Sequence, residues 1–146
     1  MESIDQKSDP TARTGDSVLA CARRLSKVVT AIYDDNLRSF GISATQFAFL
    51  MTIGRVSVTR AEIARLHHLS KSTLTRDLKT VPSAGWIQEV REDANGRSRP
   101  LALTTAGKEL VLNAQQAWLM AQTQAVALLG TDTMNALTSI TDYINP

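Results

Sequence analysis

The chain has 146 residues, of which 43% are hydrophobic and 21% charged, a composition typical of one globular unit and not of a disordered chain. Its only cysteine, Cys21, excludes an intramolecular disulfide and a cysteine-rich metal site. The formal net charge is +2, but residues 55–99 carry nine basic and five acidic side chains, so the middle of the chain is basic.

Residues 1–15 combine Ser, Asp, Thr, Pro and Gly without a periodic apolar pattern, which predicts a flexible tail. Residues 1–6 lack the basic and apolar segments of a signal peptide. No apolar stretch approaches the roughly 20 residues that a membrane span requires. We therefore expect a cytoplasmic protein without a membrane partner.

Residues 16–40 are predicted to form one long helix that ends at Gly41. A second apolar stripe, Tyr33, Leu37 and Phe40, exceeds what a helix with one buried face requires, and it suggests that a partner chain covers this end. The main stripe follows alternating spacings of four and three through Val18, Ala22, Leu25, Val29 and Ile32.

Three shorter helices are expected between residues 43 and 81. Ser43 with Gln46 and Thr59 with Glu62 have the form of capping boxes, in which paired side chains satisfy backbone N–H groups of a first helical turn. Ser70 can cap the third of these helices. The second and third, joined by a tight turn, predict a helix-turn-helix.

Residues 86–90 and 101–104 favour β-strands, and the loop between them contains Asn95-Gly96, which predicts a hairpin. Residues 105–129 are helical in composition, and Gly130 separates them from a final helix. The predicted fold is therefore mainly α with a small β-hairpin, in the order four helices, hairpin and two helices.

The third short helix has an outer face of small hydroxyls and long cations, which suits the major groove of DNA. Arg76 can reach guanine N7 and O6, and Lys79 can reach a phosphate. Thr73 and Thr75 can contact thymine methyl groups. Taken alone, such a helix is equally well a solvated polar surface.

The predicted hairpin loop, residues 91–99, concentrates three arginines where the chain projects from the body. An arginine at a loop tip fits the narrow, electronegative minor groove. A helix-turn-helix followed directly by a basic hairpin is more specific than either part, because together they reach adjacent grooves of one duplex.

The runs AEIARL (61–66), LSKSTLTR (69–76), GWI (85–87) and RSRPLALTTAG (97–107) resemble the MarR family of bacterial transcription regulators. The resemblance extends over nearly the whole chain from Asp16. It implies a winged helix-turn-helix homodimer that binds an inverted repeat of double-stranded DNA, usually as a repressor that a small-molecule effector or an oxidant releases. Residues 16–42 and 105–146 would form the dimerisation helices of a single unit, 16–146, and residues 43–104 the DNA-binding lobe.

By position, the resemblance places the recognition helix at residues 70–76 and the wing-tip arginine at Arg97. Two departures stand out: Asn95 replaces the aspartate that usually positions that arginine, and Val81-Pro82 should shorten the recognition helix. The predicted DNA contacts are Ser70, Lys71, Ser72, Thr73, Thr75, Arg76, Lys79, Arg97 and Arg99.

Other side chains allow two interpretations each. Cys21 could sense oxidants as in some relatives, but a cysteine beside an apolar stripe is more often a buried hydrophobe. Adjacent His67 and His68 point in different directions, so a place near the DNA backbone for one of them is favoured over a metal site. Core packing is favoured over an effector pocket for Tyr33, Trp86, Trp118 and Met120.

No cofactor, metal site or catalytic set is expected from the sequence, so an enzyme is the least favoured function. The alternative to a DNA-binding regulator is a winged-helix dimer that binds another protein. That module would show weak salt dependence and no preference for a DNA sequence.

Overall fold

The computed structural model describes residues 17–55, 57–81, 85–90 and 99–144. The predicted tail at 1–15 and the hairpin loop at 91–98 lie outside these residues. The elements in chain order are α1 (Val18–Leu37), η2 (Arg38–Phe40), α2 (Ala44–Arg55), α3 (Arg60–Leu66), α4 (Lys71–Thr80), β1 (Ile87–Glu89), β2 (Leu101–Leu103), α5 (Thr105–Leu129) and α6 (Thr131–Ile144). The predicted order of four helices, a hairpin and two helices is confirmed.

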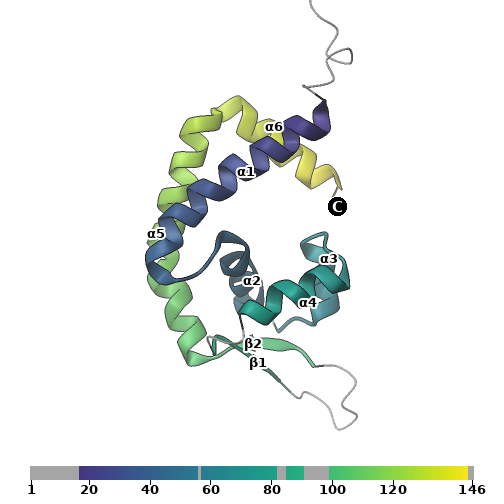
Figure 1. The fold of residues 1–146 in the computed structure, drawn as a ribbon, viewed down its shortest axis with the longest axis vertical. Helices are drawn as coiled ribbons and strands as arrows, with labels where there is room; N and C mark the ends of the chain where they lie inside the picture. The colour runs from purple at the N-terminus through teal and green to yellow at the C-terminus, as the bar shows by residue number, and fades with distance from the viewer. Residues whose placement is uncertain (1–16, 56, 82–84, 91–98, 145–146) are drawn as a thin grey trace, which may run out of the picture.

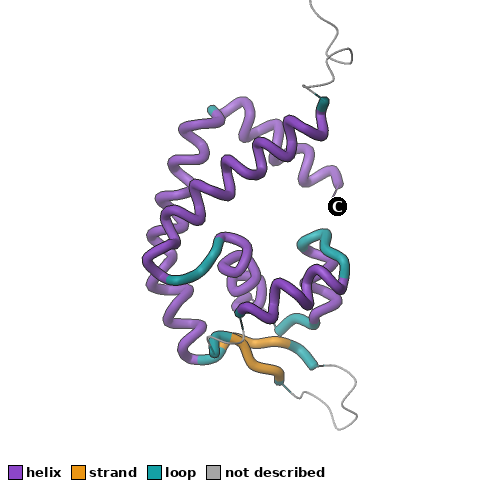
Figure 2. The backbone as a smooth tube through the Cα atoms, in the orientation of Figure 1, coloured by secondary structure: helices purple, strands orange, loops and turns teal. Residues whose placement is uncertain are grey.

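Two parts are visible in Figure 1, with the long helix α5 running through both. Helices α1 and α6 lie with the C-terminal half of α5 in the upper part, while α2, α3, α4 and the hairpin form the lower part. Figure 2 shows that the two strands of the hairpin are the only strands among the described residues. The fold class is therefore mainly helical, as predicted.

The predicted caps form at the starts of α2, α3 and α4. The Ser43 hydroxyl accepts from the Gln46 N–H at 3.2 Å, and the Gln46 side chain accepts from the Ser43 N–H at 3.0 Å. Thr59 and Glu62 form the same reciprocal pair, and the Thr59 backbone N–H lowers the pKa of the Glu62 carboxyl. Ser70 caps α4 by accepting from the Thr73 N–H. Local chemistry thus sets three helix starts.

The end of the first helix differs from the prediction of one helix through residue 40. The α-helix ends at Leu37, and the chain tightens into the 3₁₀ turn η2 before Gly41. Gly41 adopts φ +67°, and its N–H donates to the Arg38 carbonyl at 3.1 Å. The tighter turn closes the helix with a short-range hydrogen bond.

The second apolar stripe of α1 packs against other parts of the same chain, so its size alone does not require a partner chain. Leu37 is fully buried in the core, and Phe40 packs against it. Tyr33 packs on Trp118 of α5, with ring centroids 4.5 Å apart. The stripe is used inside the chain because α5 passes along this face of α1.

The core lies between α2, the helix-turn-helix, β2 and α5. Helix α2 is its centre, since four of its twelve residues are buried. The large side chains that are fully buried are Phe47, Phe49, Leu37, Leu50, Ile63, Leu74, Leu101 and Val81.

The hairpin is antiparallel, with Ile87 opposite Leu103 and Glu89 opposite Leu101. Val58, between α2 and α3, adds an isolated bridge to Leu101 that the sequence analysis did not predict. The Leu101 N–H donates to the Val58 carbonyl at 2.8 Å. This bridge ties the base of the hairpin to the start of the helix-turn-helix.

The junction of the hairpin with α5 is closely packed around Gly107. The Thr104 hydroxyl accepts from the Gly107 N–H at 3.1 Å and donates to the Gly85 carbonyl at 2.6 Å. A Cβ at position 107 would overlap the Trp86 carbonyl oxygen and lie 3.1 Å from its carbonyl carbon. Only glycine fits here without moving the hairpin.

Gly107→Ala is therefore expected to destabilise the protein by about 3 kcal/mol, because backbone must move to relieve the overlap. Urea unfolding followed by circular dichroism measures the change. Ala106→Gly, at the exposed neighbouring helical position, is the control and should cost about 1 kcal/mol or less. Equal losses in the two variants would contradict the packing argument.

Candidate nucleic-acid interface

Helix α4 presents the polar face that the sequence predicted. Leu74 and Leu78 are buried on its inner side. Thr73 is half-buried, so it lies at the edge of the polar face and not at its centre. The exposed residues of the face are Lys71, Ser72, Thr75, Arg76 and Lys79, with the capping residue Ser70 also exposed.

The Thr75 hydroxyl donates to the Lys71 carbonyl at 2.8 Å, so its proton is committed to the helix backbone. The oxygen lone pairs and the methyl group remain directed away from that bond. Thr75 can therefore accept from cytosine N4 or adenine N6, or pack on a thymine methyl.

Three hydroxyls gather at the start of α4. The Ser70 hydroxyl donates to Thr73 Oγ1 at 2.9 Å and lies 3.1 Å from Ser72 Oγ. Since the Ser70 proton is used, Ser72 is the donor to Ser70. This network fixes small side chains at the helix N-terminus, where backbone can approach a base or a phosphate closely.

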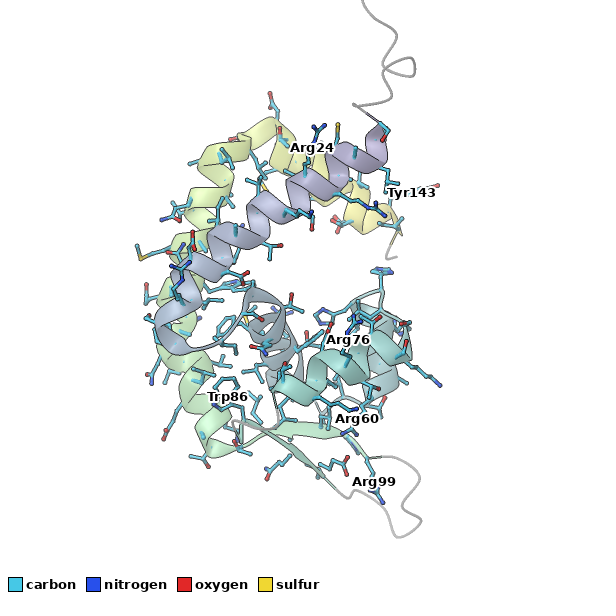
Figure 3. All side chains as sticks on the ribbon, in the orientation of Figure 1. Arg24, Arg60, Arg76, Trp86, Arg99 and Tyr143 are labelled. Carbon is cyan, nitrogen blue, oxygen red and sulfur yellow. The ribbon has the colours of Figure 1, made fainter. Side chains whose placement is uncertain are left out.

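The three long cations of α4, Lys71, Arg76 and Lys79, are exposed to solvent. The Arg76 side chain is 76% exposed, and among the described residues its ion pair is a 3.7 Å contact between Nε and Asp77 Oδ1. Such a surface contact contributes little and leaves the guanidinium donors available. Figure 3 shows Arg76 on α4 and Arg60 and Arg99 nearer the hairpin.

An ion-paired cluster joins the helix-turn-helix to the hairpin. Arg60 Nη1 lies 2.9 Å from Glu89 Oε1, and Arg99 Nη1 lies 3.4 Å from Glu89 Oε2. The hydrogen bond from Arg60 is the main reason that the pKa of Glu89 is below its usual range. Arg60 also lines a hollow of about 290 Å³ with Lys71 and Thr75 of α4. The sequence analysis predicted Arg99 but missed Arg60 and Glu89.

Arg97, Arg91 and Asn95 of the predicted wing lie outside the described residues. Their roles remain predictions from the resemblance.

A cavity of about 320 Å³ separates the first helix from the helix-turn-helix and opens to solvent. Tyr33 and Trp118 line it, so two of the aromatic residues considered for an effector pocket do meet there. Burial raises the pKa of Tyr33, whose hydroxyl donates to Gln122. Trp86 instead packs on the core at the base of the hairpin, and Met120 is exposed on α5.

His67 also lines this cavity, so of the two histidines only His68 remains a candidate for a place near the DNA backbone. The Thr52 hydroxyl donates to the Ala48 carbonyl, which leaves its oxygen to accept from His67 Nε2 at 2.9 Å. The ring meets Phe49 edge-on, with centroids 4.9 Å apart. Burial is the main cause of the lowered pKa of His67.

This lowered pKa makes stability depend on pH. Below the unfolded-state pKa of about 6.5, the unfolded chain binds the proton more tightly than the folded chain does. The free energy of unfolding should therefore fall as pH decreases from about 6.5, by no more than ~1.4 kcal/mol from this group by pH 5.5. His67→Gln should lose less stability than the wild type between pH 7.5 and 5.5 in urea unfolding. His68→Gln, which removes only the smaller effect of the neighbouring charge, should retain most of the wild-type loss. A wild-type loss retained in His67→Gln would contradict this assignment.

Cys21 is exposed on α1, so its interpretation as a buried hydrophobe within one chain is wrong. Arg24 Nη2 lies 3.6 Å from its sulfur. Redox sensing by Cys21 remains a prediction. Within the described residues, His, Cys, Asp and Glu side chains do not gather in a group of three that could hold a metal, and none of the helices has the length and hydropathy to cross a bilayer.

No family model and no curated protein sequence match the chain. Solved structures do. Apo MarR from E. coli shares 19% identity over 89% of this chain and 98% of its own, with a TM-score of 0.68. The transcriptional repressor CouR, solved bound to a 23-mer DNA duplex, shares 19% identity over 93% and 97%, with a TM-score of 0.77. The M. tuberculosis regulator MosR, solved with DNA, shares 24% identity over 88% and 96%, with a TM-score of 0.75. This chain has the winged helix-turn-helix fold of the MarR-family transcriptional regulators.

Proposed function

We propose that the protein is a sequence-specific DNA-binding transcriptional regulator, a repressor that acts as a homodimer on an inverted repeat. The observation that carries the proposal is the exposed polar face of α4, which lies beside the positively charged Arg99 just before the second hairpin strand. Solved structures with this fold include two complexes with DNA. The small hydroxyl side chains of this face let α4 approach the base edges closely, and Arg76 can bind guanine. The surrounding cations can bind the phosphates.

In this proposal the protein contacts both the major and the minor groove of the duplex. Ser72, Thr75 and Arg76 enter the major groove, with Lys71 and Lys79 on the backbone of the duplex. Arg99 is a further DNA contact at the wing, and Arg97 enters the minor groove as the resemblance implies.

The homodimer is supported by the apolar surface of the terminal helices. Helix α6, which is described throughout, buries none of its side chains, and α1 buries only Leu37. Val18 is 87% exposed and Tyr143 is 86% exposed. Exposed apolar side chains of this kind on the two terminal helices are typical of an interface. Residues 16–42 and 105–146 therefore form the dimerisation part in this proposal.

Release of the repressor is assigned to a small-molecule effector in the cavity lined by Tyr33, Trp118 and His67. The cavity lies between α1 and the DNA-binding lobe, so an occupant would change their spacing and the separation of the two recognition helices. The proposed role is regulatory and cytoplasmic, not enzymatic.

Selection of bound duplexes from a random pool tests the function. The enriched sequences should be inverted repeats with half-sites centred about 10 base pairs apart, because a two-fold dimer presents its recognition helices one helical turn apart. A pool that yields no common sequence would favour the protein-binding module over the regulator.

A further inference from the structure

A carboxylate in the middle of a proposed DNA-binding surface calls for a physical reason, because it repels phosphates. Glu89 lies on β1, between Arg60 at the first turn of α3 and Arg99 beside β2. Its two oxygens are divided between the two guanidiniums, with Oε1 on Arg60 and Oε2 on Arg99. One acidic side chain therefore connects the helix-turn-helix to the hairpin.

Stability does not account for this arrangement. The Arg60, Arg99 and Glu89 side chains are 47%, 56% and 39% exposed. Exposed ion pairs of this kind contribute little to folding, since water and salt screen them. The hairpin is already held by its strand pairing and by the Val58–Leu101 bridge.

The geometry leaves both arginines able to bind DNA. Each arginine contacts Glu89 through its Nη1 atom, and a guanidinium has five N–H donors. The remaining donors can bind phosphates while Glu89 holds the two guanidiniums at a fixed separation. Preorganised donors lose less rotamer entropy on binding than free side chains do.

We infer that Glu89 is a positioning and specificity-determining residue, which fixes Arg60 and Arg99 as one backbone-binding unit across the helix-turn-helix and the base of the wing. This inference rests on the proposed function. The carboxylate repels DNA in any binding mode in which the two arginines do not both contact phosphates. In the specific complex both arginines contact phosphates, so the charge of the carboxylate is compensated. Glu89 thus lowers non-specific affinity more than specific affinity.

Glu89→Gln removes the charge and keeps a side chain of the same size. We expect its affinity for a scrambled duplex to rise about threefold, the effect of one unit charge several ångströms from a phosphate in water. Affinity for the selected duplex should fall about threefold because the arginines are no longer fixed. Selectivity should therefore fall about tenfold.

Fluorescence anisotropy with the selected and scrambled duplexes, on the full chain, measures both affinities. Glu109→Gln, which removes an exposed carboxylate from α5, is the matched control and should change the two affinities by the same small factor. A double-mutant cycle adds Arg60→Ala, in whose background Glu89→Gln should lose much of its effect on selectivity. That coupling would not arise if Glu89 only repelled DNA.

The two possible failures are distinct. If the wild type discriminates between the duplexes and Glu89→Gln discriminates equally well, the inference about Glu89 is overturned and the proposed function stands. If Glu89→Gln raises both affinities by one factor, Glu89 is a repulsive charge without a positioning role. A wild type that binds both duplexes equally overturns the proposed function and the inference together.

Discussion

Ile140→Asp combined with Ile144→Asp is expected to convert the proposed homodimer into monomers and to lower DNA affinity more than 100-fold. Both side chains are more than half exposed on α6, at 57% and 59%. Burial of four carboxylates across a two-fold interface is strongly unfavourable, while the core of each chain stays intact. Without the partner, the second half-site no longer binds intramolecularly, which accounts for the large loss.

Light scattering after size exclusion gives the oligomeric state, and anisotropy gives the affinity. Asn135→Asp combined with Ser139→Asp is the control, since it adds the same charge at exposed positions on a different face of α6. A variant at Ile140 and Ile144 that stays dimeric would place the interface elsewhere. A monomeric variant with full affinity would contradict the requirement for a dimer.

Arg76→Ala is expected to lower affinity for the selected duplex about 10- to 100-fold while affecting the scrambled duplex far less. A good bidentate contact to guanine contributes about 1–3 kcal/mol of discrimination. The melting temperature should not change, because the side chain is 76% exposed and its contact with Asp77 is long.

Lys79→Ala provides the comparison, as it removes an exposed cation from the same helix. A phosphate contact should weaken binding to both duplexes alike and reduce the slope of log affinity against log salt by about one. If Arg76→Ala weakened both duplexes equally, Arg76 would be a phosphate ligand and the base-reading role would belong to other residues of α4.

The helix starts were open to prediction because capping is chemistry between near neighbours. The pairs Ser43–Gln46 and Thr59–Glu62 were predicted from their spacing and are confirmed by reciprocal hydrogen bonds. The exposed face of α4 followed in the same way from its period, with Leu74 as the buried reference. Interactions between near neighbours in the sequence were therefore enough to predict where these helices begin and which face of the recognition helix is exposed.

The contacts between distant elements were not open to prediction. Apolar residues at Tyr33 and Leu37 show that a face will be covered, but not whether α5 or a partner chain covers it. His67 faces the cavity because the turn before α4 lies against α2, which no local pattern indicates. The pairing of Arg60 with Glu89 arises only once the hairpin folds beside α3.

The proposed function depends on sequence-specific binding of DNA by the surface of α4 and the wing. The most direct test is anisotropy of the wild-type protein with the selected duplex and with a scrambled duplex, between 50 and 200 mM salt. We expect a selectivity of at least about 10³-fold and, with six to ten phosphate contacts, a fall in affinity of about 10³- to 10⁵-fold over that range. Equal affinity for the two duplexes, with little dependence on salt, would contradict the proposed function.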